Sequence, residues 1–350
     1  MAERAKECEY VGVLCVNTDA YDELLPNGVH AIGMNYFEVG ENNIISKLEG
    51  IKPTHIICCY PSRPILKWTI KTRVRTLPLL ADSFETKGLR SWFRNYRLKN
   101  LLNHPHFDWV ANHNLNASLS LKRIGVDPKK IIAWDFPAMV TPDQYPSKII
   151  SDGVKSFRML YVGNLIESKG VGDCIEAIKH LKEKGLDAFL TVAGPGDAEA
   201  FRKKSHQLLV ESSVKFLGRI GHDQVIKQMI EHDIVLVPSW HDYPEGLPMT
   251  IYEGFCSHTP LVVSDHPMFA GKVNHCESGM VFRAKDIKHF AEVIEELMSN
   301  PTLYETISNN AKNAWFKLQI PVKWDQLLTR WLRNSKEDRE WFRNHCLSVK

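Results

Sequence analysis

The sequence predicts an α/β protein made of two Rossmann-like halves that face each other across a cleft. Three observations support this fold class. Short apolar runs alternate with segments of helical periodicity over all 350 residues, a pattern typical of β-α units around a mostly parallel sheet. At roughly 150 residues per domain, this length suits about two domains. Residues 136–156 contain three prolines and little periodicity, which indicates a linker between two runs of β-α units.

The first half contains a series of strand-like apolar runs followed by the linker. The predicted strands are 10–16, 30–34, 55–60, 76–80, 109–112 and 131–134. A helix rich in basic and aromatic residues is predicted around 89–102. We expect residues 1–150 to form the N-terminal domain.

The second half restarts the β-α alternation after the linker. Strands are predicted at 158–162, 188–193, 215–217, 234–238 and 261–264, and helices at 171–184, 198–210, 222–231 and 288–299. We expect residues 151–321 to form the C-terminal domain. A last amphipathic helix at 322–333 places Trp324, Leu327, Leu328 and Trp331 on one face. The segment 322–350 is therefore expected to be helical and to pack back towards the N-terminal domain.

Composition and charge exclude several classes of protein. Hydrophobic residues at 44% and charged residues at 24% are ordinary globular values, unlike those of disordered or collagen-like chains. A net charge of +3 is too small to imply a nucleic-acid partner. The apolar runs are of strand length, far below the ~20 residues of a membrane span. Residues 1–10 mix acidic and basic side chains, unlike a signal or transit peptide. We expect a cytoplasmic protein.

The cysteines and histidines do not indicate a metal site. The eight cysteines are scattered and form no C-x-x-C pair, so neither zinc nor a disulfide framework is predicted. The pairs His104/His106 and His275/Cys276 lack further ligands at a recognised spacing. We expect no metal and no cofactor.

A glycine-containing turn between a strand and a helix is the first candidate ligand site. Residues 161–170 include Gly163, Asn164 and Lys169, and the helix is predicted to begin directly afterwards. Backbone amides at a helix N-terminus and a lysine cation together suit a phosphate. The alternative is an ordinary β-α turn with a solvated lysine.

Two further turns follow buried strands. Gly194 lies in a tight turn at 193–197, which by itself indicates simple turn geometry as readily as a ligand contact. Arg219 and Ile220 follow a short strand. The arginine is suited either to stacking on a base and reaching a phosphate or to an ordinary surface position.

The strongest motif lies at 238–253. A strand ends near residue 238, and a helix is predicted to begin near Leu247 and Pro248, because proline suits the first helical turn. Glu245 precedes that helix and Glu253 follows eight residues later, so the two carboxylates can hold two parts of an extended polyhydroxyl ligand. The amides of Gly246 and Leu247 would face a diphosphate. The alternative is a pair of helix-surface charges.

Taken together, residues 158–333 resemble the donor-binding half of glycosyltransferase family 4, the retaining GT-B enzymes that use nucleotide-diphosphate sugars. The matching segments occur in family order at 162–170, 192–196, 216–218, 233–239, 245–253, 260–265 and 279–282. The resemblance implies a GT-B fold, with an acceptor-binding N-terminal domain and a donor-binding C-terminal domain. The sequence leaves the donor sugar, the base, the acceptor and the linkage open.

The resemblance also implies residue roles. Lys169 would hold the donor diphosphate, Glu245 the sugar and Glu253 the ribose hydroxyls, while Arg219 and Ile220 would border the base. Glu245 and Lys169 are the implied catalytic residues. The implied donor-binding set is Gly163, Asn164, Lys169, Gly194, Arg219, Ile220, Gly246, Leu247 and Glu253.

Transfer in such enzymes is discussed as a front-face reaction with retention, in which a phosphate oxygen takes the acceptor proton. The site then needs cations and amides around the leaving group more than a strong base or magnesium. The predicted reaction moves a sugar from a nucleotide-diphosphate sugar to a glycan or lipid-linked acceptor, in surface-polysaccharide or glycolipid assembly.

The sequence departs from the family pattern at several positions. Asn164 stands where arginine is usual, and Gly271 aligns with a common glutamate. The glycine-rich loop expected near 16–19 and a histidine expected near 81–82 are both missing. These departures leave two alternatives, a non-catalytic nucleotide-sugar-binding protein and a sugar-nucleotide epimerase.

The first half carries a strongly basic segment. Residues 60–104 contain ten Lys and Arg against two acidic residues, with Trp68, Trp92, Phe93 and Tyr96 among them. The helix within 87–104 can lie on an anionic membrane surface that holds a lipid-linked acceptor. The alternative is a solvated helix whose aromatic residues pack on the domain. RNA binding is a weaker reading, because no RNA-recognition motif accompanies the charge.

Overall fold

The structure is a computed structural model that describes residues 8–16, 21–34, 36–84 and 88–349. The chain divides into two compact units, residues 1–79 with 100–108 and residues 80–99 with 109–350. The domain boundaries predicted near 150 and 321 stay predictions. Residues 17–19 of the loop expected at 16–19 lie outside the described residues, and so do the charged residues Glu85 and Lys87.

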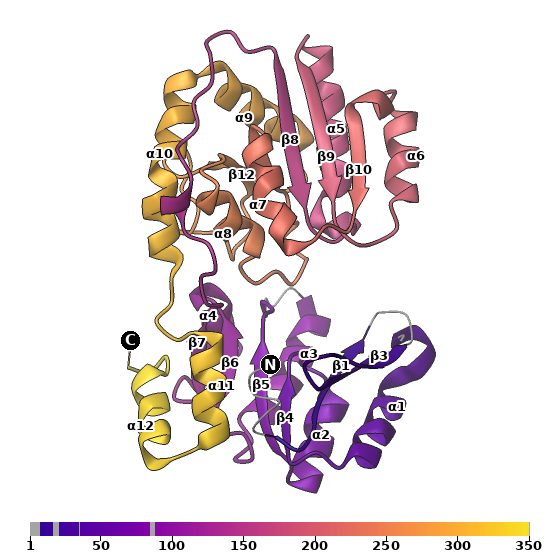
Figure 1. Ribbon diagram of the computed structural model, residues 1–350, viewed down its shortest axis with the longest axis vertical. Helices are drawn as coiled ribbons and strands as arrows, with labels where there is room; N and C mark the ends of the chain where they lie inside the picture. The colour runs from indigo at the N-terminus through magenta and orange to yellow at the C-terminus, as the bar shows by residue number, and fades with distance from the viewer. Residues whose placement is uncertain (1–7, 17–20, 35, 85–87, 350) are drawn as a thin grey trace. The chain divides into compact units, whose positions relative to one another are not determined.

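The first unit holds two groups of strands (Figure 1). β1 (Val11–Val16) and β3 (Val29–Met34) pair in parallel, and β2 (Tyr21–Leu24) pairs antiparallel with β3. β4 (His55–Cys58) pairs in parallel with β5 (Arg75–Leu80). The helices are α1 (Tyr36–Ile51) and α2 (Arg63–Thr72), the latter begun by a hydrogen bond from the Ile65 amide to the Ser62 hydroxyl.

The second unit is built around a six-stranded parallel sheet in the order β10-β9-β8-β11-β12-β13. Its strands are β8 (Ser156–Val162), β9 (Asp187–Ala193), β10 (Val214–Gly218), β11 (Ile234–Val237), β12 (Leu261–Ser264) and β13 (Met280–Phe282). β6 (Val110–His113) and β7 (Ile131–Trp134) also pair in parallel. β11 and β12 are buried at every position, as expected of central strands covered on both faces.

Helices cover the sheet of the second unit. They are α5 (Val171–Glu183), α6 (Glu199–Gln207), α7 (His222–Glu231), α8 (Met249–Cys256), α9 (Ile287–Ser299) and α10 (Pro301–Leu318). α3 (Gly88–Leu102) precedes β6 along the chain, and α4 (Leu115–Arg123) packs on β6 and β7. One apolar cluster joins α5 and α9 to the sheet, and a second joins α7, α8 and α10 to it. Because the strands and helices bury their apolar side chains against one another, polar groups that can meet a ligand are expected in the loops at the strand ends.

The linker predicted at 136–156 is anchored by a buried lysine. Lys148 Nζ donates to the carbonyl oxygens of Met229 and Ile230 at 2.9 Å each and of His232 at 2.5 Å. These carbonyls lie at the end of α7, where helical partners run out. Burial lowers the pKa of Lys148 to about 8, although the nearby Asp233 charge opposes that shift. Lys148 therefore closes the C-terminus of α7.

The segment 322–350 forms α11 (Trp324–Arg333) and α12 (Lys336–His345). Phe342 stacks on Trp109 with ring centroids 5.0 Å apart, and Cys346 pairs with Ile132 of β7. The fully buried Asp338 carboxylate accepts from Arg330 at 3.1 Å and from Arg333. The contacts with Trp109 and Ile132 hold the segment against the β6/β7 region, and the Asp338 ion pairs join α11 to α12.

Helix α6 is shorter than predicted. The periodicity predicts a helix over 198–210, whereas α6 ends at Gln207. Leu209 adopts a left-handed backbone conformation with φ of 58°, so the chain turns before the apolar Val210 reaches the core. Of the helices that the structure describes, none combines the length and the apolar character that crossing a membrane requires.

Candidate functional site

The polar residues singled out in the second half gather at the carboxyl ends of the six-stranded sheet. Its strand order reverses between β8 and β11, and open α/β sheets bind ligands at such a switch point. Lys169 follows β8 and Glu245 follows β11. The two residues given catalytic roles by the resemblance therefore come from the two strands that flank the switch point.

The structure brings Lys169 and Glu245 into direct contact. Lys169 Nζ lies 2.7 Å from Glu245 Oε2, and Ser239 Oγ donates to the same oxygen at 2.8 Å. The two side chains are only 13% and 9% exposed, so the ion pair is largely shielded from water. The Tyr243 ring lies 4.9 Å from Lys169 Nζ. A lysine cation that is shielded from water and paired with a carboxylate is suited to exchange that carboxylate for a phosphate group.

The loops of this edge meet so closely that glycine is required. A Cβ on Gly194 would lie 1.8 Å from the carbonyl oxygen of Gly163. A Cβ on Gly170, which has φ of 77°, would lie 2.4 Å from the carbonyl oxygen of Pro238. The glycines thus bring the turn after β8 against β9 and β11. Gly170 is also the N-cap of α5 and has no side chain that could cap the helix, so the first amides of α5 are suited to an anion.

The start of α8 differs from the prediction. The helix begins at Met249, and Pro248 is its N-cap with extended backbone angles instead of lying in the first turn. A proline also disfavours helical angles in the residue before it, here Leu247. The amides of Gly246 and Leu247 therefore belong to the loop that leads into the helix. At Gly246 a Cβ would lie 2.4 Å from the carbonyl oxygen of Ala81. The loop therefore packs closely against the backbone of Ala81, the residue that follows β5.

Glu253 lies within α8 and is 8% exposed. Its Oε1 is 3.2 Å from Nδ1 of His222, the first residue of α7. Burial raises the pKa of Glu253, and the His222 charge opposes the shift. A buried carboxylate with an exposed and replaceable partner is suited to accept hydrogen bonds from a diol.

The remaining predicted residues lie at the same edge. Gly163 donates its amide to the Ala193 carbonyl oxygen at 3.0 Å. Asn164 and Arg219 are exposed, and Ile220 packs against the apolar cluster of α7 and α8. Arg219 forms no ion pair within the part of the chain that the structure describes. Asn164 and Arg219 both remain available to a ligand, and their assigned roles stay predictions.

Asp82 is a site residue that the sequence reading missed. It follows β5, in the segment where Ser83 N donates to Pro244 O at 3.4 Å. Burial raises the pKa of Asp82 to about 6, and the charge of Glu245 adds to the shift. The one available signal was its place directly after a buried strand. A carboxylic acid that titrates near Glu245 makes the edge sensitive to pH.

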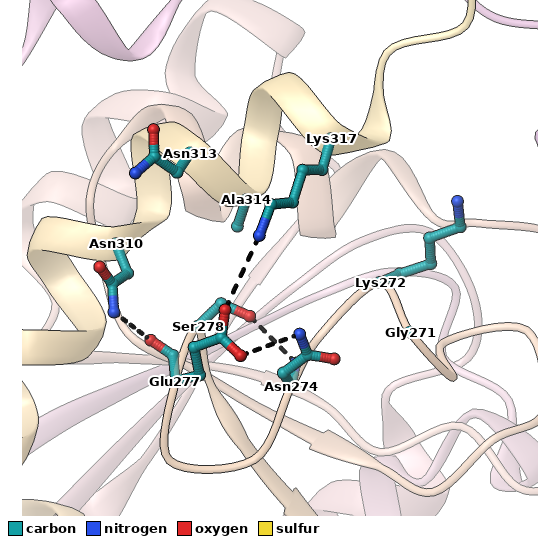
Figure 2. Close-up of a pocket in the computed structure, with 9 residues that line it drawn as sticks. All are labelled: Gly271, Lys272, Asn274, Glu277, Ser278, Asn310, Asn313, Ala314 and Lys317. Atoms are coloured by element: carbon teal, nitrogen blue, oxygen red, sulfur yellow. Dashed lines mark hydrogen bonds and ion pairs between the residues drawn. The ribbon is translucent and has the colours of Figure 1, made fainter.

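A small pocket of about 70 Å³ lies between the loop at 271–278 and α10. Figure 2 shows that several of its polar side chains are hydrogen-bonded or ion-paired within the pocket lining. Asn310 donates to the Glu277 carbonyl oxygen at 2.9 Å, and Asn274 donates to the Glu277 carboxylate at 3.2 Å. Gly271 lines this pocket, but none of the residues predicted to bind the donor does. The pocket is therefore distinct from the predicted donor site.

Within the described ranges, no group of three His, Cys, Asp or Glu side chains is arranged to hold a metal ion. The expectation that the reaction needs no metal or cofactor stays a prediction.

Comparison with known proteins bears on this edge directly. Residues 148–314 match the family described as Glycosyl transferases group 1. This segment is similar to the glycosyl transferases of that group. It contains every residue of the predicted donor site, from Gly163 to Glu253. The match confirms the glycosyltransferase resemblance, while the narrower assignment to family 4 stays a prediction.

Two curated relatives cover parts of the chain. The amylovoran biosynthesis glycosyltransferase AmsK of Erwinia amylovora is 29% identical over 48% of this chain and 44% of its own length. The glycogen synthase of Mycobacterium tuberculosis is 25% identical over 61% of this chain and 47% of its own length. The matches thus span less than half of each of these relatives.

Solved structures extend the likeness to most of the chain. Sucrose-phosphate synthase from Thermosynechococcus elongatus has a TM-score of 0.68 at 16% identity and covers 97% of this chain and 92% of its own. Anabaena HepE, solved in complex with UDP-glucose, has a TM-score of 0.67 at 16% identity and covers 88% and 86%. These likenesses show the fold. The chain has the α/β GT-B fold predicted from its sequence.

Proposed function

We propose that this protein is a retaining glycosyltransferase that moves a sugar from a nucleotide-diphosphate sugar to a glycan or lipid-linked acceptor. The observation that carries the proposal is the shielded ion pair between Lys169 and Glu245 at the switch point of a glycosyl transferases group 1 domain. Relatives named for amylovoran and capsular polysaccharide biosynthesis support a role in surface-polysaccharide or glycolipid assembly.

In this proposal the donor lies along the carboxyl edge of the sheet. The diphosphate takes over the Lys169 ammonium group and meets the amides of Gly246 and Leu247. The Glu253 carboxylate accepts hydrogen bonds from the ribose, displacing the exposed His222. Glu245, released from Lys169, is free to contact the sugar. At Lys169 one anion replaces another, and at Glu253 and Glu245 neutral hydroxyl donors of the ligand replace the side chains of His222 and Lys169.

The reaction chemistry follows from what the edge offers. The acceptor oxygen attacks the anomeric carbon from the side that the diphosphate leaves, and a phosphate oxygen takes its proton. Lys169 and the loop amides then stabilise the negative charge that develops on the leaving group. The protein positions the reactants and supplies this electrostatic stabilisation, with no metal step.

The test uses the full chain and a panel of UDP-, GDP- and ADP-sugars. Release of the nucleoside diphosphate is followed with and without acceptor extract, and the anomeric configuration of the product is read by NMR. Transfer with retention supports the proposal. Interconversion of the sugar without transfer would identify an epimerase, and donor binding without turnover would identify a non-catalytic binding protein. Inversion at the anomeric carbon would refute the retaining mechanism.

We also propose that α3 brings the protein to the cytoplasmic face of an anionic membrane. Trp92, Phe93 and Tyr96 are 49%, 53% and 46% exposed, so they are not packed into the unit. Trp92 and Tyr96 stack with ring centroids 5.6 Å apart. Arg90 and two further arginines of the helix are also exposed. None of these arginines forms an ion pair among the described residues. Unpaired cations beside exposed aromatic rings suit an interfacial helix.

Vesicle sedimentation tests the membrane proposal. The wild-type protein is expected to bind vesicles of acidic phospholipid at low salt, to bind neutral vesicles little, and to be released by salt. The triple variant Arg90→Glu, Arg94→Glu and Arg97→Glu should lose binding but keep nucleotide affinity. Its matched control carries the same charge change at the exposed Lys203, Lys215 and Lys227 of the second unit. Equal loss in the control would show that total charge, and not α3, causes the binding.

A further inference from the structure

The end of β6 holds a buried histidine that the sequence reading did not single out. His113 is the last residue of β6 and is 3% exposed. Its ring is enclosed by Trp134, Phe136 and Tyr252, with centroid distances of 5.0, 5.3 and 6.1 Å. Such a ring cannot rotate freely, so the direction of each ring nitrogen is fixed by the fold.

One ring nitrogen is held by a carboxylate. His113 Nε2 lies 3.3 Å from Asp135 Oδ1, and Asp135 is 1% exposed. Lys323 Nζ donates to the other carboxylate oxygen at 3.3 Å. Burial alone would raise the pKa of Asp135, but the His113 hydrogen bond and the Lys323 charge hold it below its ordinary value. Asp135 is therefore an anion, and it fixes the tautomer of His113 with the proton on Nε2.

The other ring nitrogen is directed at the candidate site. Nδ1 lies 3.9 Å from the position that a Cβ of Gly246 would occupy. Gly246 directly follows Glu245, whose carboxylate pairs with Lys169. Among the described residues, Nδ1 has no hydrogen-bond partner. It therefore presents a lone pair beside the loop of Glu245.

We propose that His113, oriented by Asp135, accepts a hydrogen bond through Nδ1 from a sugar hydroxyl bound at the Glu245–Gly246 loop. The inference rests on the proposed function and adds a specificity-determining residue to it. A carboxylate-fixed imidazole is an acceptor of defined direction, so it favours a sugar with a hydroxyl at one position. The hydroxyl belongs either to the donor sugar or to the acceptor, and the experiment distinguishes the two.

Two variants separate this role from a structural one. His113→Asn keeps a polar amide near the position of Nδ1 but loses the group that meets Asp135. His113→Gln keeps an amide near the position of Nε2 and loses the group at Nδ1. If His113 serves only to satisfy the buried Asp135, Gln preserves both stability and activity better than Asn does. If Nδ1 binds a hydroxyl, the order of activity is reversed.

The experiment measures melting temperature, UDP affinity and turnover of the most active donor from the panel of nucleotide sugars. His113→Gln is expected to bind UDP like the wild-type protein and to lose turnover by about tenfold or more. His113→Asn is expected to melt at a lower temperature than His113→Gln and still to turn over faster. Wild-type turnover in His113→Gln, or an equal loss in both variants, would overturn the inference.

The source of the hydroxyl follows from comparing two reactions of His113→Gln. A loss in donor hydrolysis without acceptor assigns the hydroxyl to the donor sugar. A loss confined to transfer in the presence of acceptor assigns it to the acceptor. If the wild-type protein itself turned over none of the donors, the proposed function would fall, and the inference with it. The inference on His113 fails by itself only when the wild-type protein is active. Its failure is therefore distinguishable from failure of the proposed function.

Discussion

Gly246 occupies a position where a single methyl group is expected to disturb the whole site. A Cβ there would lie 2.4 Å from the Ala81 carbonyl oxygen and 3.3 Å from its carbon. Contacts of Cβ atoms shorter than 3.0 Å are essentially never found, so in Gly246→Ala the loop must move away from β5 by at least 0.6 Å. The obstacle is backbone at the end of a strand, so it has little freedom to yield.

The displacement has a calculable effect on Glu245, the preceding residue. Lys169 Nζ and Glu245 Oε2 are 2.7 Å apart, and a shift of the same size along this line gives 3.3 Å or more. Hydrogen bonds weaken steeply over that interval. Misplacement of a reacting group by about 1 Å can lower a rate by about 10²-fold. We therefore expect Gly246→Ala to reduce turnover by ten- to a hundredfold, on the order given by that relation.

The assay is steady-state release of nucleoside diphosphate, run beside thermal unfolding. Gly50→Ala is the matched control, because Gly50 lies in α1 and a Cβ there would meet nothing within 4 Å. Alanine is the better helix former, so the control should keep full turnover and an equal or higher melting temperature. Wild-type turnover in Gly246→Ala would show that the loop tolerates displacement, and that the close approach to Ala81 does not position the site.

Three further predictions concern charged residues of the same edge. Glu253→Ala should weaken nucleoside-diphosphate binding by roughly 10- to 150-fold, because a hydrogen-bonded buried carboxylate contributes ~1.5–3 kcal/mol; unchanged affinity in calorimetry would remove Glu253 from the ribose site. Lys169→Ala should lower turnover by about 10²-fold or more, and Glu245→Ala should lower turnover more than it lowers nucleotide affinity. Full activity in either variant would place the chemistry elsewhere. The activity of the wild-type protein should survive EDTA. Asp82, whose pKa is raised to about 6 by burial and the Glu245 charge, binds its proton more tightly in the folded state, so its contribution to stability should fall as pH rises from about 4 to about 6. Asp82→Asn should then be the more stable protein at pH 7, by up to roughly 3 kcal/mol, with the difference vanishing near pH 4; a pH-independent difference in denaturant unfolding would contradict this assignment.

The sequence predicted the second half of the chain well because its signals are local. Strands such as β12 are continuous apolar runs between turn residues, and α7 was predicted with the bounds that the structure gives. Gly163 was singled out because glycine lets the backbone approach a ligand, and Gly194 because it lies in a tight turn. The structure shows instead that the two backbones approach each other closely. The glycosyltransferase resemblance followed from these turns in order.

The features that the sequence did not yield depend on contacts between distant segments. His113 and Asp135 each look like a polar residue ending a strand, and only the fold brings them together beside Gly246. Burial raises the pKa of Asp82, and the charge of Glu245, 163 positions further along the chain, adds to the shift. α10 was not predicted, although its apolar positions follow a helical period. The start of α8 was placed too early because the rule for proline in a first turn also allows the N-cap seen here.

Lys148 has a consequence for dividing the chain experimentally. A truncated protein that starts at the predicted boundary, residue 151, would lack the ammonium group that meets three carbonyl oxygens at the end of α7. It would also lose the hydrogen bond of 2.7 Å from the Lys148 amide to Ser308 of α10. Each bond to a charged group contributes ~1.5–3 kcal/mol, which is a large share of the stability of a domain this size. A fragment that contains the six-stranded sheet should therefore start upstream of residue 145, because the stretch before β8 contacts α7 and α10.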